Sequence, residues 1–98
     1  MTSHASILDE RLKLSPSVSL RPEPFGALAY HFGNRRLTFL KRPELVEVVS
    51  ALDGRRTLRE VLTDCEIPEW QWPAYDATIE RLMGADMLQV VTLAAVGG

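Results

Sequence analysis

The chain has 98 residues, of which 46% are hydrophobic and 24% are charged, and its formal net charge is −2. These values indicate one compact domain with a single modest core, and they exclude a disordered chain and make a deep, enclosed active site unexpected. Cys65 is the only cysteine and can form no internal disulfide, and the sequence contains neither an apolar signal segment nor a run of about 20 apolar residues. We therefore expect a soluble, cytoplasmic protein.

The first part of the chain shows little periodicity. Residues 1–17 have no sustained apolar pattern, and we expect them to form a weakly structured N-terminal arm. The following run, VSLRPE, places Val18 and Leu20 on one side of an extended segment. Pro22 and Pro24 cannot donate to a β-ladder, so this first expected strand belongs at the edge of a sheet.

A β-hairpin is predicted for the stretch YHFGNRRLTFL, residues 30–40. Its Gly33-Asn34 dipeptide is a strong signal for a two-residue turn of type I′ or II′, because glycine supplies the positive φ that such turns need. Counting outward from this loop gives the facing pairs Phe32 and Arg35, Tyr30 and Leu37, and Leu28 and Phe39. One face of the ribbon is then apolar and consists of Leu28, Tyr30, Phe32, Leu37 and Phe39. The opposite face carries Ala29, His31, Arg36 and Thr38.

After the hairpin, the apolar spacing changes from two residues to about 3.6, which is typical of helices. Pro43 is well suited to open the first helix, and Gly54 follows it where a C-cap is expected. The buried stripe of this helix consists of Leu45, Val48, Val49 and Leu52. Thr57 and Glu60 have the spacing of a capping box, which starts a short second helix. The two helices form an αα corner of the helix-turn-helix kind.

A third helix is predicted from Pro73 to Gly84, with Tyr75, Ile79, Leu82 and Met83 toward the core. The last extended run, MLQVVTL, adds a strand or wing, and residues 93–98 form a frayed tail. We therefore predict an α+β, winged helix-turn-helix-like fold in which a three-stranded antiparallel sheet packs on three α-helices. The domain is expected to span residues 18–92.

The sequence contains no catalytic or metal-binding constellation. A zinc site needs about four ligands at close spacing, whereas His4, His31 and Cys65 are scattered. Asp64 and Glu66 flank Cys65 and disfavour its thiolate, which argues against a nucleophile. We expect no enzymatic activity, no metal and no cofactor.

Two tryptophans follow the second predicted helix, in the proline-broken stretch CEIPEWQWP. Because aromatic side chains dominate burial in small domains, we expect Trp70 and Trp72 to cover the core. The alternative is that an exposed tryptophan anchors a partner.

A winged-helix regulator that binds DNA is one of the two binding functions considered. Its recognition helix would need several basic or amide side chains. The third helix offers Arg81 against Asp76 and Glu80, which phosphates would repel, and the second helix offers only Arg59. Nucleic acid is therefore the weaker candidate partner.

Capture of an extended peptide is the other candidate function. If the LTFL strand is an edge, its free N–H and C=O groups are a template for an added strand. Four flanking cations attract an acidic segment and discourage self-association: Arg35, Arg36, Lys41 and Arg42. On a helical wheel of about 100° per residue, the third helix carries a shoulder beside its core stripe, formed by Ala74, Ala77, Thr78, Arg81 and Ala85. Small side chains there would admit another backbone, although alanine is also simply a good helix former.

The order of these elements resembles a known family over residues 18–91. The stretch LDGRRTLREVL resembles the helix-Asp-Gly-x-x-Thr-helix junction of the PqqD-like RiPP recognition elements, which bind leader peptides of ribosomally made natural products. The stretch FGALAYHFGNRRLTFL is similar to the hairpin of the MftB family of mycofactocin-biosynthesis chaperones.

This resemblance implies a function and a binding site. The leader of a precursor peptide would be captured as a fourth strand beside the 35–41 strand, in a groove against the third helix, and presented to a radical SAM enzyme. The resemblance implies no bound metal or cofactor, and the iron–sulfur cluster would belong to the enzyme. The leader-contacting residues on the strand would be Arg35, Arg36, Leu37, Thr38, Phe39, Leu40 and Lys41. Those on the helix, chosen with the helical wheel, are Ala74, Thr78, Arg81 and Ala85.

Overall fold

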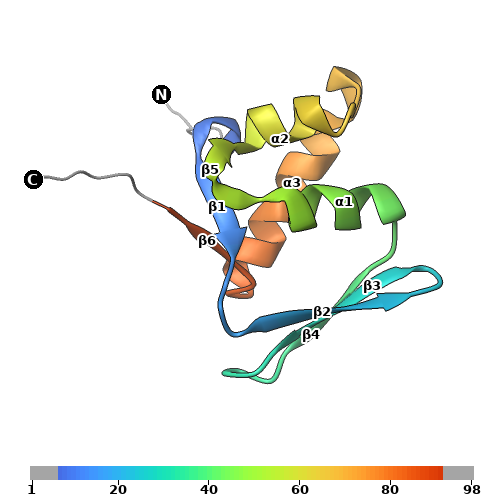
Figure 1. Ribbon diagram of the computed structural model, residues 1–98, viewed down its shortest axis with the longest axis vertical. Coiled ribbons are helices and arrows are strands. Elements are labelled where there is room, and N and C mark those ends of the chain that lie inside the picture. Colours follow the sequence, from blue (N-terminus) through green and yellow to red (C-terminus); the bar gives the residue numbers. More distant parts are fainter. Residues whose placement is uncertain (1–6, 92–98) are drawn as a thin grey trace, which may run out of the picture.

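The computed structural model describes residues 7–91, which form three α-helices and two three-stranded antiparallel sheets. Figure 1 shows one sheet lying below the helices and the other to one side of them. The α+β class and the three helices agree with the prediction. The strands differ from the prediction, because they are divided over two sheets where one was expected. The predicted likeness to a winged helix-turn-helix is not confirmed.

The first sheet has the strand order β5-β1-β6 and joins distant parts of the chain. Its strands are β1 (Arg11–Leu14), β5 (Asp53–Thr57) and β6 (Leu88–Val90). Residues 11–14, expected within a weakly structured arm, are therefore its central strand, and Leu12 is fully buried there. The segment that forms β5 was predicted to be the turn of an αα corner. That prediction was wrong, and Gly54 adopts its φ of +80° within β5.

The second sheet has the order β2-β3-β4 and contains the predicted hairpin. Its strands are β2 (Val18–Glu23), β3 (Gly26–His31) and β4 (Leu37–Leu40). The predicted pairs Tyr30–Leu37 and Leu28–Phe39 are both present, which confirms the register. β2 lies at one edge, as expected from its prolines, and β4 lies at the other.

The turn between β3 and β4 differs from the predicted two-residue loop. Arg35 donates its backbone N–H to the His31 carbonyl at 2.8 Å, so four residues, 32–35, form the loop. The positive φ belongs to Arg35, at 63°, and not to Gly33. Side chains stabilise this turn: the Nδ1 atom of His31 accepts the N–H groups of Gly33 and Asn34 at 3.0 and 3.1 Å.

The two faces of this sheet are both apolar, and the face with the smaller side chains is the buried one. Ala27, Ala29 and Leu40 are at most 2% exposed, and α1 (Pro43–Ala51) packs on this side. Small side chains let the helix approach closely. The larger side chains of the predicted apolar surface face away from the core, as described below.

The three helices enclose most of the core. α1 buries Leu45, Val48 and Val49, and α2 (Leu58–Asp64) begins with the predicted capping box between Thr57 and Glu60. α3 (Trp72–Gly84) buries Tyr75, Ile79 and Leu82, and it ends at the expected glycine. Two short 3-10 helices, η1 (Ile7–Asp9) and η2 (Glu69–Gln71), precede β1 and α3. The predicted frayed tail, residues 93–98, lies outside the described residues.

Candidate functional site

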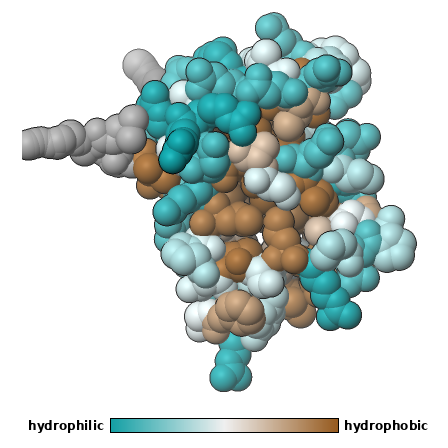
Figure 2. Space-filling view, in the orientation of Figure 1, coloured by the Kyte–Doolittle hydropathy of each residue, from teal (hydrophilic) through white to brown (hydrophobic). Residues whose placement is uncertain are grey.

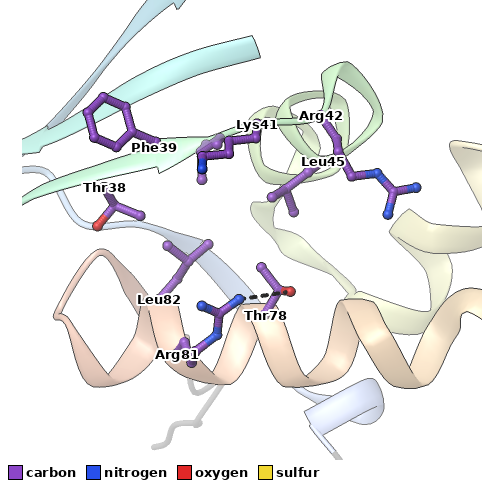
Figure 3. A pocket seen from close by; sticks show the side chains of 9 residues that line it. Thr38, Phe39, Lys41, Arg42, Leu45, Thr78, Arg81 and Leu82 are labelled. Carbon is purple, nitrogen blue, oxygen red and sulfur yellow. Dashed lines mark hydrogen bonds between the residues drawn. The ribbon is translucent and has the colours of Figure 1, made fainter. Parts of the chain in front are cut away.

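A groove lies between the edge strand β4 and helix α3 (Figure 3). Its cavity has a volume of about 450 Å³. The β4 side and the segment that follows it contribute Thr38, Phe39, Leu40, Lys41, Arg42 and Leu45. The α3 side contributes Thr78, Arg81 and Leu82. Figure 2 shows apolar side chains in the middle of the molecular face, where the helices meet the β2-β3-β4 sheet.

The outer edge of β4 is open, because no strand within residues 7–91 pairs with it there. His31 donates its N–H to the Arg36 carbonyl at 2.9 Å, which fixes the phase of the β3–β4 ladder. In an antiparallel ladder, hydrogen-bonded and non-hydrogen-bonded residue pairs alternate. Counting from the His31–Arg36 pair, the backbones of Thr38 and Leu40 are therefore the ones that bond to Ala29 and Ala27 of β3. The backbone N–H and C=O groups of Leu37 and Phe39 therefore point outward.

The side chains of β4 alternate between the two sides of the sheet. Leu40 is buried and Thr38 is half-buried on the groove side, whereas Leu37 and Phe39 are 55% and 58% exposed on the other side. A strand added to β4 would continue this alternation. One set of its side chains would enter the groove and the other set would lie on the outer face of the sheet.

The α3 side of the groove combines apolar and cationic groups. Arg81 is exposed and donates from Nη2 to Thr78 Oγ1 at 3.4 Å, and Leu82 forms part of the buried floor. Ala74 lines a smaller adjoining recess together with Tyr75. Ala85 lies outside the groove lining, but its carbonyl accepts the Asn34 side-chain amide at 3.3 Å, which links the hairpin loop to the end of α3.

The structure thus brings together part of the predicted peptide-contact set. Four strand residues, 38–41, line the groove with Thr78 and Arg81. Arg35, Arg36 and Leu37 do not line it, although the backbone of Leu37 faces the open edge. Whether these residues contact a peptide stays a prediction.

The predicted peptide-contact set left out three groove residues, Arg42, Leu45 and Leu82, and Arg42 had been named only as a cation flanking the strand. Leu45 and Leu82 had been assigned to core stripes, and each also reaches the groove floor. Arg42 lies at the junction of β4 and α1, with its guanidinium 5.7 Å from the centre of the Tyr75 ring. Its position between an edge strand and a helix was the available signal.

Tyr75 lines the smaller adjoining recess, beside this arginine. Burial raises the pKa of its hydroxyl, and the nearby Arg42 charge opposes this shift. The hydroxyl oxygen is buried and has no hydrogen-bond partner among the residues described. The Tyr75 side chain therefore acts as a packing surface of the adjoining recess, and its ring lies beneath the Arg42 guanidinium.

The groove is positively charged. Lys41 and Arg81 form no ion pair within the described part of the chain, and Arg42 lies 4.0 Å from Glu44. Lys41 and Arg81 are both solvent-exposed, so their attraction for a carboxylate depends on the salt concentration. The arrangement suits an extended segment that carries acidic side chains.

The remaining candidate residues have other environments. Burial raises the pKa of the Cys65 thiol, and Glu47 adds to this effect, so the thiolate is disfavoured as expected. Within residues 7–91, no group of three His, Cys, Asp or Glu side chains could hold a metal ion, and no helix is long and apolar enough to cross a membrane. Trp72 is half-buried and donates to the Ile67 carbonyl at 2.9 Å. Trp70 is 79% exposed, so the prediction that it covers the core was wrong.

Comparisons with known proteins identify relatives of this chain. Residues 11–89 match the model of the peptide chaperone MftB family. The peptide chaperone MftB of Mycobacterium tuberculosis is 38% identical over 80 residues, which cover 82% of this chain and 73% of the relative. The protein of the same name from Mycolicibacterium smegmatis is 40% identical over 80 residues, covering 82% of this chain and 78% of the relative. No solved structure was found to match.

The match begins at β1, includes all three helices, and covers both sheets except for Val90, the last residue of β6. The relatives are named as peptide chaperones and not as enzymes. This agrees with the expectation, drawn from the hairpin and the Asp-Gly-x-x-Thr junction, of a recognition element of the mycofactocin kind. The chain belongs to the peptide chaperone MftB family.

Proposed function

We propose that this peptide chaperone binds the leader of a ribosomally synthesised precursor peptide, the mycofactocin precursor, and delivers it to a radical SAM maturase in the cytoplasm. The leader adds to β4 as a fourth strand of the β2-β3-β4 sheet. The observation that carries the proposal is the combination of an open strand edge with a cationic groove on the same side of β4.

The binding energy can come from three sources. The outward N–H and C=O groups of Leu37 and Phe39 supply ladder hydrogen bonds. The floor at Leu45 and Leu82 buries apolar side chains of the peptide. Lys41 and Arg81 attract its carboxylates. Together these must exceed the cost of ordering a flexible leader, about 2–5 kcal/mol.

Delivery requires no catalytic group on the chaperone. A leader held on a protein that also docks the enzyme raises the local concentration of the reacting end of the peptide, to about the millimolar range for a short flexible tether. The maturase supplies the chemistry, and the chaperone supplies the capture and the tether.

Amide shift mapping with a synthetic leader of the mycofactocin precursor tests the capture step. We expect the largest shifts at the Leu37 and Phe39 amides, because these gain hydrogen-bond partners, and further shifts around Thr78 on α3. The amides of β1 should change little, since β1 is the central strand of the other sheet. A footprint confined to the β5-β1-β6 sheet would contradict the proposed site.

Charge reversal at Arg81 tests the electrostatic part of the site. We expect Arg81→Glu to weaken binding of an acidic leader by about 0.2–1 kcal/mol per lost exposed ion pair, and more at low salt than at high salt. Fluorescence anisotropy of a labelled leader at two salt concentrations measures this. Lys13→Glu is the matched control, because it makes the same change in net charge at an exposed position on β1. Equal losses in both variants would show that only net charge matters.

A further inference from the structure

The face of the β2-β3-β4 sheet that points away from the core carries an exposed apolar surface. We call this surface the outer face, and its apolar residues are Phe25, Leu28, Tyr30, Phe32, Leu37 and Phe39. Three of them are more than half exposed, with Phe32 at 62%, Phe39 at 58% and Leu37 at 55%, and Phe25 is 39% exposed. Neighbouring apolar side chains with this exposure are unusual on a small protein without a partner.

The outer face is ordered although it contributes nothing to the buried core. The rings of Phe25 and Phe39 pack edge to face with centroids 5.8 Å apart, and Tyr30 and Phe32 pack similarly at 5.1 Å. The core-facing side of the same strands is filled by Ala27, Ala29 and Leu40. The aromatic rings of the outer face are thus held in fixed contact with one another, although they add no buried apolar area to the core of the fold.

We propose that the outer face docks the enzyme that receives the captured peptide, through an enzyme surface with an apolar centre and an acidic rim. This inference rests on the proposed function, because the docking partner is the radical SAM maturase named there. A recess of about 450 Å³ lined by Phe25, Phe39 and Lys41 offers a place for one anchoring side chain of the partner.

The charges around the outer face favour an acidic partner over a second copy of this chain. Lys41 borders the recess and Arg35 lies in the same loop as Phe32. Arg21 shares this side of the sheet with Leu28. The carboxylate on this side, Glu23, is already paired with Arg21 at 3.3 Å. Two copies packed face to face would bring like charges together, whereas carboxylates on the partner would complement them.

The position of the outer face also suits delivery. Leu37 and Phe39 present their backbone to the open edge and their side chains to the outer face. A peptide strand on β4 would extend this face by one strand, with alternate side chains beside these two residues. An enzyme seated there would touch the chaperone and the bound leader at once.

The test separates docking from capture with the double variant Phe25→Ser, Phe32→Ser. Both residues lie in turns outside β4 and supply no backbone group to its open edge, although Phe25→Ser removes the ring contact with Phe39. Titrations with a synthetic leader of the mycofactocin precursor and with the purified radical SAM maturase of mycofactocin biosynthesis give the two affinities. We expect leader affinity within about twofold of wild type and maturase affinity lower by about tenfold or more, as for loss of aromatic anchors.

Trp70→Ser is the matched control, because it removes an exposed aromatic ring from η2, outside the outer face. It should leave the maturase affinity unchanged. A charge variant, Arg21→Glu, replaces the Arg21–Glu23 pair by two carboxylates, so it should weaken binding of the maturase's acidic rim most strongly at low salt. Retained leader binding shows that the variants are folded.

Three outcomes overturn the inference. The first is unchanged maturase affinity in the double variant. The second is a loss in Trp70→Ser that equals the loss in the double variant. The third is a concentration-dependent dimer of wild-type protein that the double variant abolishes, since a second copy would then be the occupant. Failure of the wild-type protein to bind the leader would instead contradict the proposed function.

Discussion

Leader binding is expected to fall by about 5- to 150-fold when Leu37 is replaced by proline. Proline removes the outward N–H of residue 37, so a peptide carbonyl loses its partner at a cost of about 1–3 kcal/mol. The proline ring also occupies space that the added strand needs. The fold should survive, because the His31 N–H still donates to the Arg36 carbonyl and residue 37 gives no hydrogen bond to β3. Calorimetric titration with the synthetic leader measures the effect.

Two controls make this result specific to the strand edge. Leu37→Val retains the N–H and an apolar side chain, and it should bind the leader nearly as wild type does. Thr38→Pro removes an N–H that points into the ladder toward Ala29, so we expect it to lower the free energy of unfolding. Unchanged leader affinity in a folded Leu37→Pro variant would refute strand addition at β4.

The hairpin shows why a register can be predicted when its turn cannot. A two-residue loop at positions 33–34 and the observed four-residue loop at 32–35 have the same centre, so both give the pair Tyr30–Leu37. The turn itself is set by side chains. His31 accepts two loop amides, and the Asn34 side-chain oxygen accepts the Arg36 N–H at 2.9 Å. The Gly33-Asn34 dipeptide, on which the turn prediction was based, carries no information about these side-chain contacts.

The sheet shows a second limit of periodicity. Alternation correctly separated the two faces of the hairpin, but it does not say which apolar face is buried. The buried face carries alanines, because α1 packs closely against it, and the larger rings face outward. Which of the two apolar faces is buried depends on the side of the sheet on which α1 packs.

Elements formed by distant pairing were the least predictable. β1 has four residues, and its strand character depends on partners 40 or more positions away in β5 and about 75 positions away in β6. A pattern of four residues carries too little local signal. By contrast, α3 has a long apolar stripe, and its orientation places Thr78 and Arg81 on the adjacent shoulder, where both line the groove.

Filling the groove from the α3 side is expected to block the leader without changing β4. Thr78→Trp places a large, rigid side chain in a cavity of about 450 Å³ between α3 and the strand edge. We expect leader affinity to fall by about tenfold or more, which corresponds to a loss of at least about 1.4 kcal/mol. Anisotropy with the labelled leader measures it, and thermal unfolding checks that the half-buried position tolerates the ring.

Ala77→Trp is the matched control, because residue 77 precedes Thr78 on the same helix, is exposed and does not line the groove. It should bind the leader as wild type does. Thr78→Trp and Leu37→Pro together also locate the peptide. Loss in both variants places it between β4 and α3, whereas loss in Leu37→Pro alone would mean that it adds to the strand but leaves the groove empty. Loss in Thr78→Trp alone would mean that the leader binds α3 without extending the sheet.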